Sequence, residues 1–183
     1  MLVQSAMEFD LYIKSMDADP SAPCAIYAHE FFCGSLLDFD QVVQFGLTCD
    51  ILTIEIEHVN VDALDYLASL GKKVFPQPSV LRKIQNKRIQ KEFFVEHEIP
   101  TADFKQVTEE LSLYISQFPV VQKAETGGYD GKGVQVLRTK EDISKALPGA
   151  TFIENLVPFD KELAVIVARS PSGEMRTFPV VEM

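Results

Sequence analysis

A glycine-rich run, TGGYDGKG at residues 126–133, has the composition of an anion-binding loop. Its four glycines can adopt positive φ angles and let the backbone come close to a ligand, and successive N–H groups in such a loop form a nest for anions. The run is not a Walker A loop, because Gly-Lys-Ser/Thr is absent and a strand rather than a helix is expected after it. The same strand argues against a dinucleotide fingerprint. Two interpretations stay open: a flap that closes over phosphates, and an ordinary hairpin turn.

Lys123 favours the phosphate flap over the ordinary turn. It ends an apolar stretch, PVVQK, four residues before the first glycine, where its ammonium group could reach phosphates covered by the loop. Lysine serves in such a place as a compact point charge. The alternative is a solvated lysine at a strand end, but the neighbouring loop leads us to predict a ligand-binding cation.

A second polar group follows another apolar strand. Glu154 ends the stretch TFIE, and Asn155, Leu156 and Val157 continue it as extended chain. The main-chain N–H and C=O groups of such a segment suit the edge of an adenine base. Glu162 lies eight residues after Glu154, and its carboxylate could accept both ribose hydroxyls. Taken alone, Glu162 is more simply a surface residue at the start of a strand.

Glu55, Glu57 and His58, in the stretch TIEIEHV, are candidates for contact with a polar substrate. They follow a β-branched apolar run, and strand ends in open α/β sheets point into the ligand crevice. Charges buried at the end of such a strand are costly without a partner, so two carboxylates and an imidazole there suggest substrate contacts. Helix capping and ion pairing with the following turn is an equally good alternative.

The first half of the chain alternates short strands with helices, which predicts a parallel, doubly wound sheet. Residues 50–55 (DILTIE) are nearly continuous in apolar side chains, as in a strand buried on both faces. Gly71 is expected to end the helix before it. We expect helices at residues 1–9, 39–45, 61–70 and 79–97, and strands at residues 11–16, 31–33, 50–55 and 73–76.

Pro100 indicates a division between two domains, because the residue before a proline is pushed out of the α region. We place the first domain at residues 1–98 and the second at residues 99–183. The second is predicted to be α+β with antiparallel strands, unlike the first. We expect helices at residues 108–116 and 139–146, and strands at 119–123, 134–137, 151–154, 161–169 and 176–181, the last two joined by a Ser-Pro-Ser-Gly hairpin.

The composition argues against several classes of function. The formal net charge of −10 argues against general nucleic-acid binding and against docking on anionic membranes. No apolar run approaches the roughly 20 residues of a spanning helix. Three cysteines without a CxxC pair argue against disulfides and for the cytoplasm, and we expect buried thiols. The histidines fall at no zinc-ligand spacing with them.

Together these residues resemble the N5-carboxyaminoimidazole ribonucleotide synthetase family of ATP-grasp enzymes, which is also described as the ATPase subunit of phosphoribosylaminoimidazole carboxylase. The resemblance covers nearly the whole chain in the family's order. GGYDGKG together with EIEHV is its most specific part, whereas the general ATP-grasp features would also fit biotin carboxylase or glycinamide ribonucleotide enzymes. The matching stretches are DADPSAPCA, LTIEIEHV, IQNKRIQKEFF, IPTADF, VVQKAETGGYDGKGV, FIENLVPFDKELAVIVAR and GEMRTFPVVE.

The resemblance implies a Rossmann-like pre-ATP-grasp domain followed by part of an α+β ATP-grasp domain. It implies a ligase that uses ATP and Mg²⁺ to join bicarbonate to 5-aminoimidazole ribonucleotide in purine biosynthesis. The products would be N5-carboxyaminoimidazole ribonucleotide, ADP and phosphate, formed through carboxyphosphate. It also implies a cytoplasmic enzyme with small-molecule substrates, a homodimer as a candidate assembly, and an association with lyase and decarboxylase activity through the carboxylase.

Carried over by position, the resemblance assigns roles to individual residues. Glu55 and Tyr129 are candidates for the imidazole ribonucleotide and the carboxylating centre, with His58 and Asp130 as weaker ones and Glu57 beside them. Lys87 is a looser match, because the family often has arginine there. The residues expected to bind ATP are Lys87, Lys123, Gly128, Tyr129, Asp130, Gly131, Lys132, Gly133, Val134, Glu154, Asn155, Leu156, Val157 and, at the ribose, Glu162.

The chain departs from the family pattern at both ends. The family begins with a strand and a GGGQLG-like loop, and this chain starts after them. The family continues past FPVVE with acidic and asparagine ligands for Mg²⁺ and further basic residues, so we expect no metal ligand in this chain. Because the charge of phosphoryl transfer must be neutralised, we expect the chain alone to be inactive. Another ATP-grasp ligase, acting on formate or glycine, and a non-catalytic nucleotide-binding fragment remain as alternatives.

Overall fold

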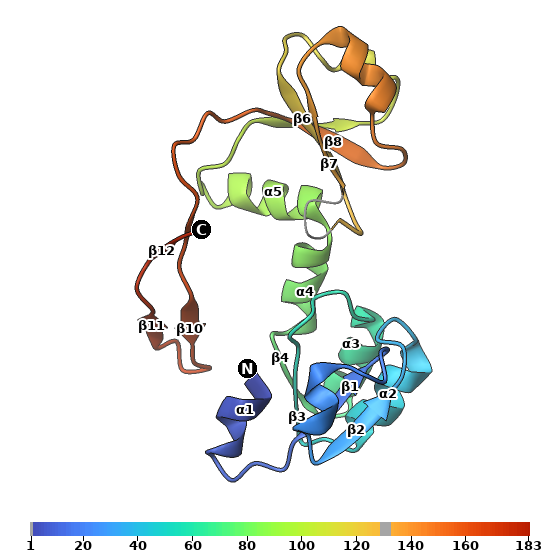
Figure 1. Ribbon diagram of the computed structural model, residues 1–183, viewed down its shortest axis with the longest axis vertical. Coiled ribbons are helices and arrows are strands. Elements are labelled where there is room, and N and C mark those ends of the chain that lie inside the picture. The colour runs from blue at the N-terminus through green and yellow to red at the C-terminus, as the bar shows by residue number, and fades with distance from the viewer. Residues whose placement is uncertain (1, 129–132) are drawn as a thin grey trace.

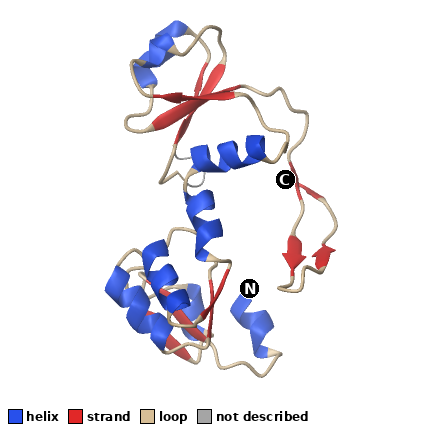
Figure 2. Cartoon of the chain, turned by 180° about the vertical axis from the view of Figure 1, so that it is seen from behind, coloured by secondary structure: helices blue, strands red, loops and turns tan. Residues whose placement is uncertain are grey.

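The computed structural model describes residues 2–128 and 133–183. Two lobes are joined by consecutive helices, α4 (Pro78–Gln85) and α5 (Lys87–Glu96), and a C-terminal arm runs back from the second lobe towards the first (Figures 1 and 2). The first lobe alternates helices with parallel strands, and the second is built on antiparallel strands. This confirms the predicted fold class, an α/β domain followed by part of an α+β domain. Within the described ranges, no helix is long and apolar enough to cross a membrane.

The first lobe contains two parallel strand pairs in place of a single sheet. β1 (Lys14–Asp17) pairs with β2 (Glu30–Cys33), and β3 (Ile51–Thr53) pairs with β4 (Lys73–Phe75). In the described part of the chain no ladder joins one pair to the other, so the predicted doubly wound sheet is seen as two parallel pairs. The helical elements of this lobe are α1 (Leu2–Met7), the 3₁₀ turn η1 (Pro23–Ile26), α2 (Phe39–Leu47) and α3 (Val61–Ser69).

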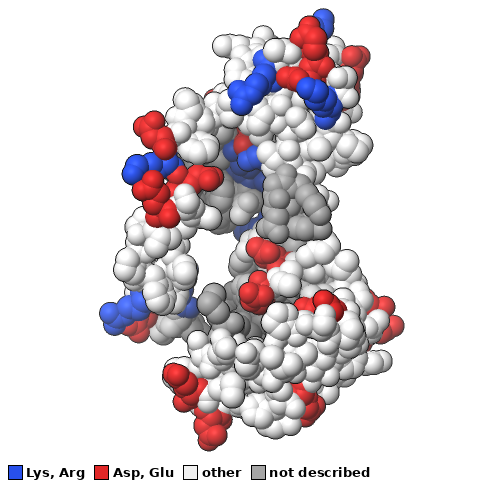
Figure 3. Space-filling model, in the orientation of Figure 1, with Lys and Arg blue, Asp and Glu red and all other residues white. Residues whose placement is uncertain are grey.

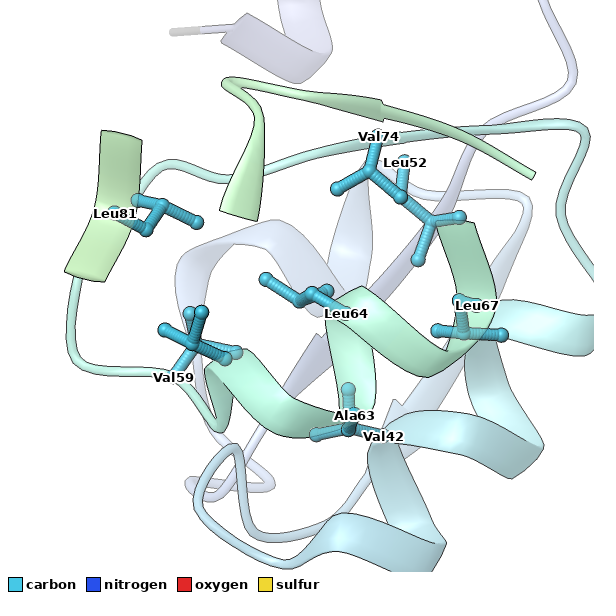
Figure 4. Packing of buried hydrophobic residues seen from close by; sticks show 9 residues of the cluster. Val42, Leu52, Val59, Ala63, Leu64, Leu67, Val74 and Leu81 are labelled. Atoms are coloured by element: carbon cyan, nitrogen blue, oxygen red, sulfur yellow. The ribbon is translucent and has the colours of Figure 1, made fainter. Parts of the chain in front are cut away.

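One apolar cluster holds the first lobe together (Figure 4). Leu64 and Leu67, three residues apart, lie on the same side of α3, and both are almost completely buried. They share the cluster with Leu52 of β3 and Val74 of β4, so helix and strand pair are packed on one another. The other buried members of the cluster are Val42, Val59, Val61, Ala63 and Leu81.

The ends of α3 follow from two residues that suit helix termini. The side-chain oxygen of Asn60 accepts a hydrogen bond from the N–H of Ala63 at 2.9 Å, which satisfies one of the free donors of the first turn. Gly71 follows the last turn with a φ of 88°, a left-handed conformation that glycine adopts without steric cost. The predicted end of this helix at Gly71 is confirmed.

Strand β3 is shorter and less buried than the sequence predicts. It ends at Thr53, and only Leu52 is buried, whereas Ile51 and Thr53 are exposed. Successive side chains of a strand point to opposite faces, so Leu52 faces the cluster and its neighbours face the other side, which no described element covers. The expectation of a strand buried on both faces is therefore wrong.

The three cysteines are free thiols, and none of them is buried. Cys33 is exposed at the end of β2, while Cys24 and Cys49 are half-buried. The Cys49 thiol lies 3.6 Å from the carbonyl oxygen of Phe45, a contact at the end of α2. The expectation of buried structural thiols is wrong, because all three cysteines occur near the ends of elements, and Cys49, which packs against the apolar cluster, lies only at its edge.

Two helices replace the single helix expected at residues 79–97. Asn86 is extended, with φ −118° and ψ 105°, and its side-chain oxygen accepts hydrogen bonds from the N–H groups of Arg88 and Ile89, both at 3.0 Å. Asparagine is a favoured N-cap residue, so Asn86 ends α4 and starts α5. The break lets α4 place Leu81 in the cluster of the first lobe, while α5 lies against the second lobe.

A four-stranded antiparallel sheet, in the order β5-β8-β6-β7, forms the second lobe. Strands β6 (Val120–Ala124), β7 (Val134–Leu137) and β8 (Thr151–Asn155) agree with the predicted strands, whereas β5 (Phe104–Val107) has no predicted counterpart. One face of the sheet carries a second apolar cluster, formed by Leu111, Val120, Leu137 and Ile153.

The helices expected at residues 108–116 and 139–146 are only 3₁₀ turns. They are η2 (Leu111–Leu113) and η3 (Lys140–Lys145). Asp142 Oδ2 accepts the N–H of Thr139 at 3.2 Å, so the predicted start of the second turn is present. Helices this short gain too few hydrogen bonds to offset the cost of nucleation, so the chain folds back into a strand in each case.

The C-terminal arm consists of two small antiparallel pairs. β10 (Val167–Arg169) pairs with β11 (Met175–Thr177), and β9 (Leu163–Ala164) pairs with β12 (Val181–Glu182). This confirms the predicted hairpin, although each long strand is interrupted. Apolar side chains of the arm such as Ile166 and Phe178 are exposed. The arm is therefore held in this conformation by pairing of its strands more than by burial of its side chains.

A buried carboxylate attaches α5 to the sheet of the second lobe. Glu125, which follows β6, accepts hydrogen bonds from Arg88 Nε at 3.0 Å and from Gln106 Nε2 at 3.1 Å, and its carbonyl oxygen accepts the N–H of Lys87 at 2.8 Å. Burial of the Arg88 guanidinium lowers its pKa, but the hydrogen bond to Glu92 and the charge of Glu125 outweigh this effect and raise the pKa overall. Arg88 therefore remains a cation beside the buried Glu125.

We predict that Leu64→Ala destabilises the first lobe by about 2–5 kcal/mol, the usual cost of a cavity in a packed core, because this side chain is only 1% exposed. Urea unfolding followed by circular dichroism measures the change. Leu70→Ala, the same substitution at the exposed end of α3, is the control and should cost less than about 1 kcal/mol. Equal effects of the two substitutions would contradict the packing described here.

We also predict that Arg88→Met lowers the free energy of unfolding by roughly 3 kcal/mol, because it leaves the buried carboxylate of Glu125 without its cation. Adding Glu125→Gln should recover part of the loss. Arg82→Met is the matched control: Arg82 pairs with Asp62 and Asp65 at the exposed surface, where ion pairs contribute about 0–1 kcal/mol. If Arg88→Met were as mild as Arg82→Met, the attachment of α5 through Glu125 would be refuted.

Candidate functional site

The register of the second sheet brings Lys123 and Glu154 together. Between β6 and β8, Lys123 lies opposite Phe152 and Val121 lies opposite Glu154. Opposed residues of antiparallel strands share a face, and diagonal neighbours are within reach of long side chains. Lys123 is the diagonal neighbour of Glu154, and its ammonium group forms an ion pair with Glu154 Oε1.

Lys91 of α5 binds the second oxygen of the same carboxylate. Its Nζ lies 2.8 Å from Glu154 Oε2 and 5.5 Å from the ring centre of Phe104, which is within cation–π distance. Phe104 is paired directly with Glu154 across β5 and β8, so the ring and the carboxylate meet Lys91 from the same face. Lys91, Glu154 and Lys123 are called here the lysine–glutamate triad.

The three side chains of the triad differ in burial, and together they carry one surplus positive charge. The side chains of Glu154 and Lys91 are 9% and 11% exposed, while that of Lys123 is 30% exposed. Buried charges are tolerated when they are paired, and here one carboxylate is shared by two ammonium groups. The surplus charge is therefore most accessible at Lys123, next to the glycine-rich hairpin.

The glycine-rich run joins β6 to β7 as a hairpin. Gly127 and Gly133 have φ angles of 73° and 76°, which confirms that this loop uses glycine for left-handed backbone. The N–H of Ala124 donates to the carbonyl oxygen of Gly133 at 2.8 Å, and a Cβ atom at Gly133 would lie 3.1 Å from the Cα of Gly128. The predicted site residues at the tip, Tyr129, Asp130, Gly131 and Lys132, lie outside the described residues.

The segment after β8 keeps main-chain groups free, as an adenine slot would need. Asn155 is still in the strand, and its N–H donates to the carbonyl oxygen of Asp103 at 3.0 Å. Leu156 is half-buried and Val157 is half exposed, and among the hydrogen bonds of the described residues none uses their backbone N–H or C=O. Glu154 itself is occupied by the two lysines, so the segment beyond it is the better candidate for a base edge.

Three further residues predicted to bind the ligand, Lys87, Val134 and Glu162, make fewer side-chain contacts than the triad does. Lys87 is the half-buried first residue of α5, one turn before Lys91 on the same side, and it forms no ion pair with any described residue. Val134 begins β7 directly opposite Lys123. Glu162 lies exposed on the C-terminal arm, where its carbonyl oxygen accepts the N–H of Met183 at 3.0 Å; within the described ranges, its carboxylate is not joined to the triad.

Glu55, Glu57 and His58 are exposed and lie in a bend after β3, not at the end of a buried strand. The side-chain nitrogen of Gln85 fixes this bend by donating to the carbonyl oxygens of Glu57 at 2.6 Å and Val59 at 2.7 Å. The argument from costly buried charge is therefore wrong for these residues, because the strand stops at Thr53. Acidic side chains are the main charged groups on the visible face of the first lobe (Figure 3).

Sequence reasoning did not single out Lys91, Arg88 or Glu125. The available signal was the spacing of Lys87 and Lys91, four residues apart and hence on one side of the helix expected at residues 79–97. The partners Glu125 and Glu154 belong to different strands. Their pairing with one helix depends on the packing of α5 on the sheet, which spacing within the sequence does not contain.

Comparisons with known proteins match each of the two lobes to a protein family. Residues 92–183 match the family model for the ATP-grasp domain, and residues 1–85 match the ribonucleotide synthetase preATP-grasp domain. The N5-carboxyaminoimidazole ribonucleotide synthase of Synechococcus elongatus is 33% identical over 190 residues, which cover 100% of this chain and 48% of the relative. The chain thus spans about half the length of the curated relatives it matches.

Two solved structures extend the comparison. N5-carboxyaminoimidazole ribonucleotide synthetase from Thermotoga maritima is 35% identical with a TM-score of 0.90, over 99% of this chain and 49% of that chain. N5-carboxyaminoimidazole synthase from Aspergillus clavatus, in complex with ADP and 5-aminoimidazole ribonucleotide, is 31% identical with a TM-score of 0.85, over 100% of this chain and 50% of that chain. With the ATP-grasp match extending over half of its length, the chain belongs to the ATP-grasp family.

Proposed function

We propose that this chain supplies the nucleotide-binding hairpin of an enzyme that carboxylates 5-aminoimidazole ribonucleotide. The substrates are ATP, bicarbonate and the ribonucleotide, and the products are N5-carboxyaminoimidazole ribonucleotide, ADP and phosphate, in purine biosynthesis. The observation that carries the proposal is the surplus positive charge of the lysine–glutamate triad beside the glycine-rich hairpin. The relative from Aspergillus clavatus, which holds ADP and 5-aminoimidazole ribonucleotide, supports the choice of substrates.

The reaction follows from the poor reactivity of bicarbonate. A bicarbonate oxygen attacks the γ-phosphorus of ATP, the bond to the bridging oxygen breaks, and ADP leaves. The carboxyphosphate that results has a good leaving group, so the exocyclic amine of the ribonucleotide attacks its carbon and phosphate departs. Charge develops on the transferred phosphoryl group, and preorganised cations that face it contribute most to such a step.

The chain's own residues then have distinct tasks. Lys123 binds the phosphates as a point charge, and Gly128, Gly133 and Val134 place the hairpin backbone over them. Leu156 and Val157 receive the adenine edge through their main-chain groups, Asn155 lies beside the base, and Glu162 binds the ribose. Lys87 adds a second cation at the phosphates.

The hairpin tip and the first lobe complete the proposed site. Tyr129, Asp130, Gly131 and Lys132, which lie outside the described residues, are assigned to phosphate binding, and Tyr129 and Asp130 also to the carboxylating centre. Glu55, Glu57 and His58 contact the imidazole ribonucleotide. Their exposure supports this assignment, since no described ion pair occupies them.

We also propose that the enzyme uses Mg²⁺, but the described residues of this chain do not form a binding site for the ion. They contain no group of three or more His, Cys, Asp or Glu side chains placed to hold a metal ion. Glu154 and Glu125, the most buried carboxylates near the hairpin, are already paired with Lys91, Lys123 and Arg88. No step of the reaction is therefore assigned to the metal in this chain.

The remaining assignments concern the setting of the enzyme. We propose a cytoplasmic enzyme, which free thiols and relatives in nucleotide biosynthesis support, with a homodimer as its assembly. Association with lyase and decarboxylase activity comes from relatives named phosphoribosylaminoimidazole carboxylase. We also place the division between the two domains at residues 98 and 99, just after the end of α5.

The phosphate assignment predicts that Lys123→Ala lowers ATP affinity at least about tenfold, because a hydrogen bond to a charged group is lost. Isothermal titration calorimetry with the protein expressed from its complete gene gives the dissociation constant. Lys105→Ala is the matched control, since Lys105 is exposed on β5 and lies on the opposite face of the sheet from Glu154. Unchanged ATP affinity in Lys123→Ala would show the phosphate assignment to be wrong.

The acceptor assignment predicts ADP release that requires both bicarbonate and 5-aminoimidazole ribonucleotide. A coupled assay for ADP on the same protein measures it, with formate or glycine and their ribonucleotide partners as the comparison. ADP release that depends on formate or glycine would identify another ATP-grasp ligase. ATP binding without ADP release under any of these conditions would favour a non-catalytic nucleotide-binding role.

A further inference from the structure

The ammonium group of Lys123 has two competing partners. In the structure it is bound to Glu154, and on the proposed function it must bind the phosphates of ATP. Lys123 is the most exposed member of the triad, at 30%, and it ends the strand that leads into the hairpin. A change of partner is therefore sterically open to Lys123, and the question is what happens to the carboxylate it leaves.

Glu154 cannot be left alone without a large cost. Its side chain is 9% exposed, it lies opposite Phe104, and Phe152 is close by on the same strand face. A buried carboxylate that loses its only cation is strongly destabilising. If Lys123 were the sole partner of Glu154, this cost would oppose every encounter between Lys123 and a phosphate.

Lys91 removes that opposition, because it stays on the carboxylate. Its Nζ is 2.8 Å from Glu154 Oε2, a different oxygen from the one that Lys123 uses. It is 11% exposed and is also held over the ring of Phe104. Arg88, one turn earlier on α5, fixes the helix to the sheet through Glu125. Lys91 is thus the more buried partner of Glu154, with a second contact to Phe104, and Lys123 is the more exposed one.

We propose that Lys91 is a positioning residue that retains the Glu154 carboxylate and so releases Lys123 to the phosphates of the nucleotide. This inference rests on the proposed nucleotide binding, which it deepens. Lys91 does not touch the nucleotide; it lowers the cost of the partner change by keeping Glu154 neutralised. Without Lys91, Glu154 would hold Lys123 more tightly and the nucleotide would compete less well.

The first test measures nucleotide affinity in the protein expressed from its complete gene. Lys91→Met should weaken ATP and ADP binding about tenfold, within the range of coupling in one ion-pair network, and Lys91→Arg should restore most of it. Lys83→Met is the matched control, because Lys83 also lies over a phenylalanine ring, 4.3 Å from that of Phe93, but is in no described ion pair. Should Lys91→Met disturb folding, Lys91→Gln keeps a hydrogen-bond donor without the charge and must show the same loss.

A double-mutant cycle separates positioning from general damage. In a Glu154→Gln background the carboxylate is gone, so Lys91→Met should no longer weaken ATP binding. A merely structural role for Lys91 predicts the same tenfold loss in both backgrounds, and that result would overturn the proposal.

The second test needs no nucleotide, so it is independent of the proposed function. The rate at which acetic anhydride modifies Lys123, read by peptide mass spectrometry, reports how tightly the ammonium is held. We expect acetylation of Lys123 to be several-fold slower in Lys91→Met than in the wild-type protein, and its rate to be unchanged in Lys83→Met. A faster or unchanged rate would refute the positioning role. Slower modification in a protein that binds no ATP would instead refute only the proposed function.

Discussion

Two buried carboxylates between α5 and the four-stranded sheet constrain the second lobe more than any other feature. Glu125 and Glu154 are 6% and 9% exposed, and a charge at such a depth requires a cation nearby. Arg88 serves the first and Lys91 the second, and their spacing of three residues puts both on one side of α5. The position of the helix on the sheet is therefore set by charge pairing, with Phe104 supplying the apolar contact beside it.

The same constraint explains why the helix is interrupted at Asn86, between α4 and α5. Helix α4 belongs to the first lobe through Leu81, which is buried in its apolar cluster. Helix α5 must present Arg88 and Lys91 to the second sheet. One straight helix through residue 86 would have to satisfy both surfaces at once. Asn86 resolves the conflict by leaving the helical region and capping the next helix with its own side chain, so each helix is oriented by the lobe it contacts.

The sequence was sufficient for those features that depend on local chemistry. Left-handed glycines at 71, 127 and 133 and the hairpin between β6 and β7 follow from residue type and order, whereas the ATP-grasp class came from the resemblance to a known family. Contacts between different strands could not be predicted from the sequence. Lys123 and Glu154 meet because of the register between β6 and β8, and Lys91 joins them because α5 packs on the sheet. β5 was missed because FKQV lacks a strong apolar pattern, and Glu55 was placed in a buried strand because β-branched residues continue past the point where pairing ends at Thr53.

If the proposed function holds, the charged side chains that meet a ligand are paired and partly buried in the second lobe but exposed to water in the first. Lys123 is partly buried and already paired, so a phosphate meets a cation that has lost part of its hydration during folding, which favours electrostatic stabilisation. Glu55, Glu57 and His58 are solvated, and a ligand that they bind must displace their water. Lysine and glycine recognise the phosphates of ATP, which every ATP-grasp enzyme uses. Discrimination among acceptors therefore depends on the solvated groups of the first lobe, where a wrong acceptor would leave desolvated polar atoms without a partner.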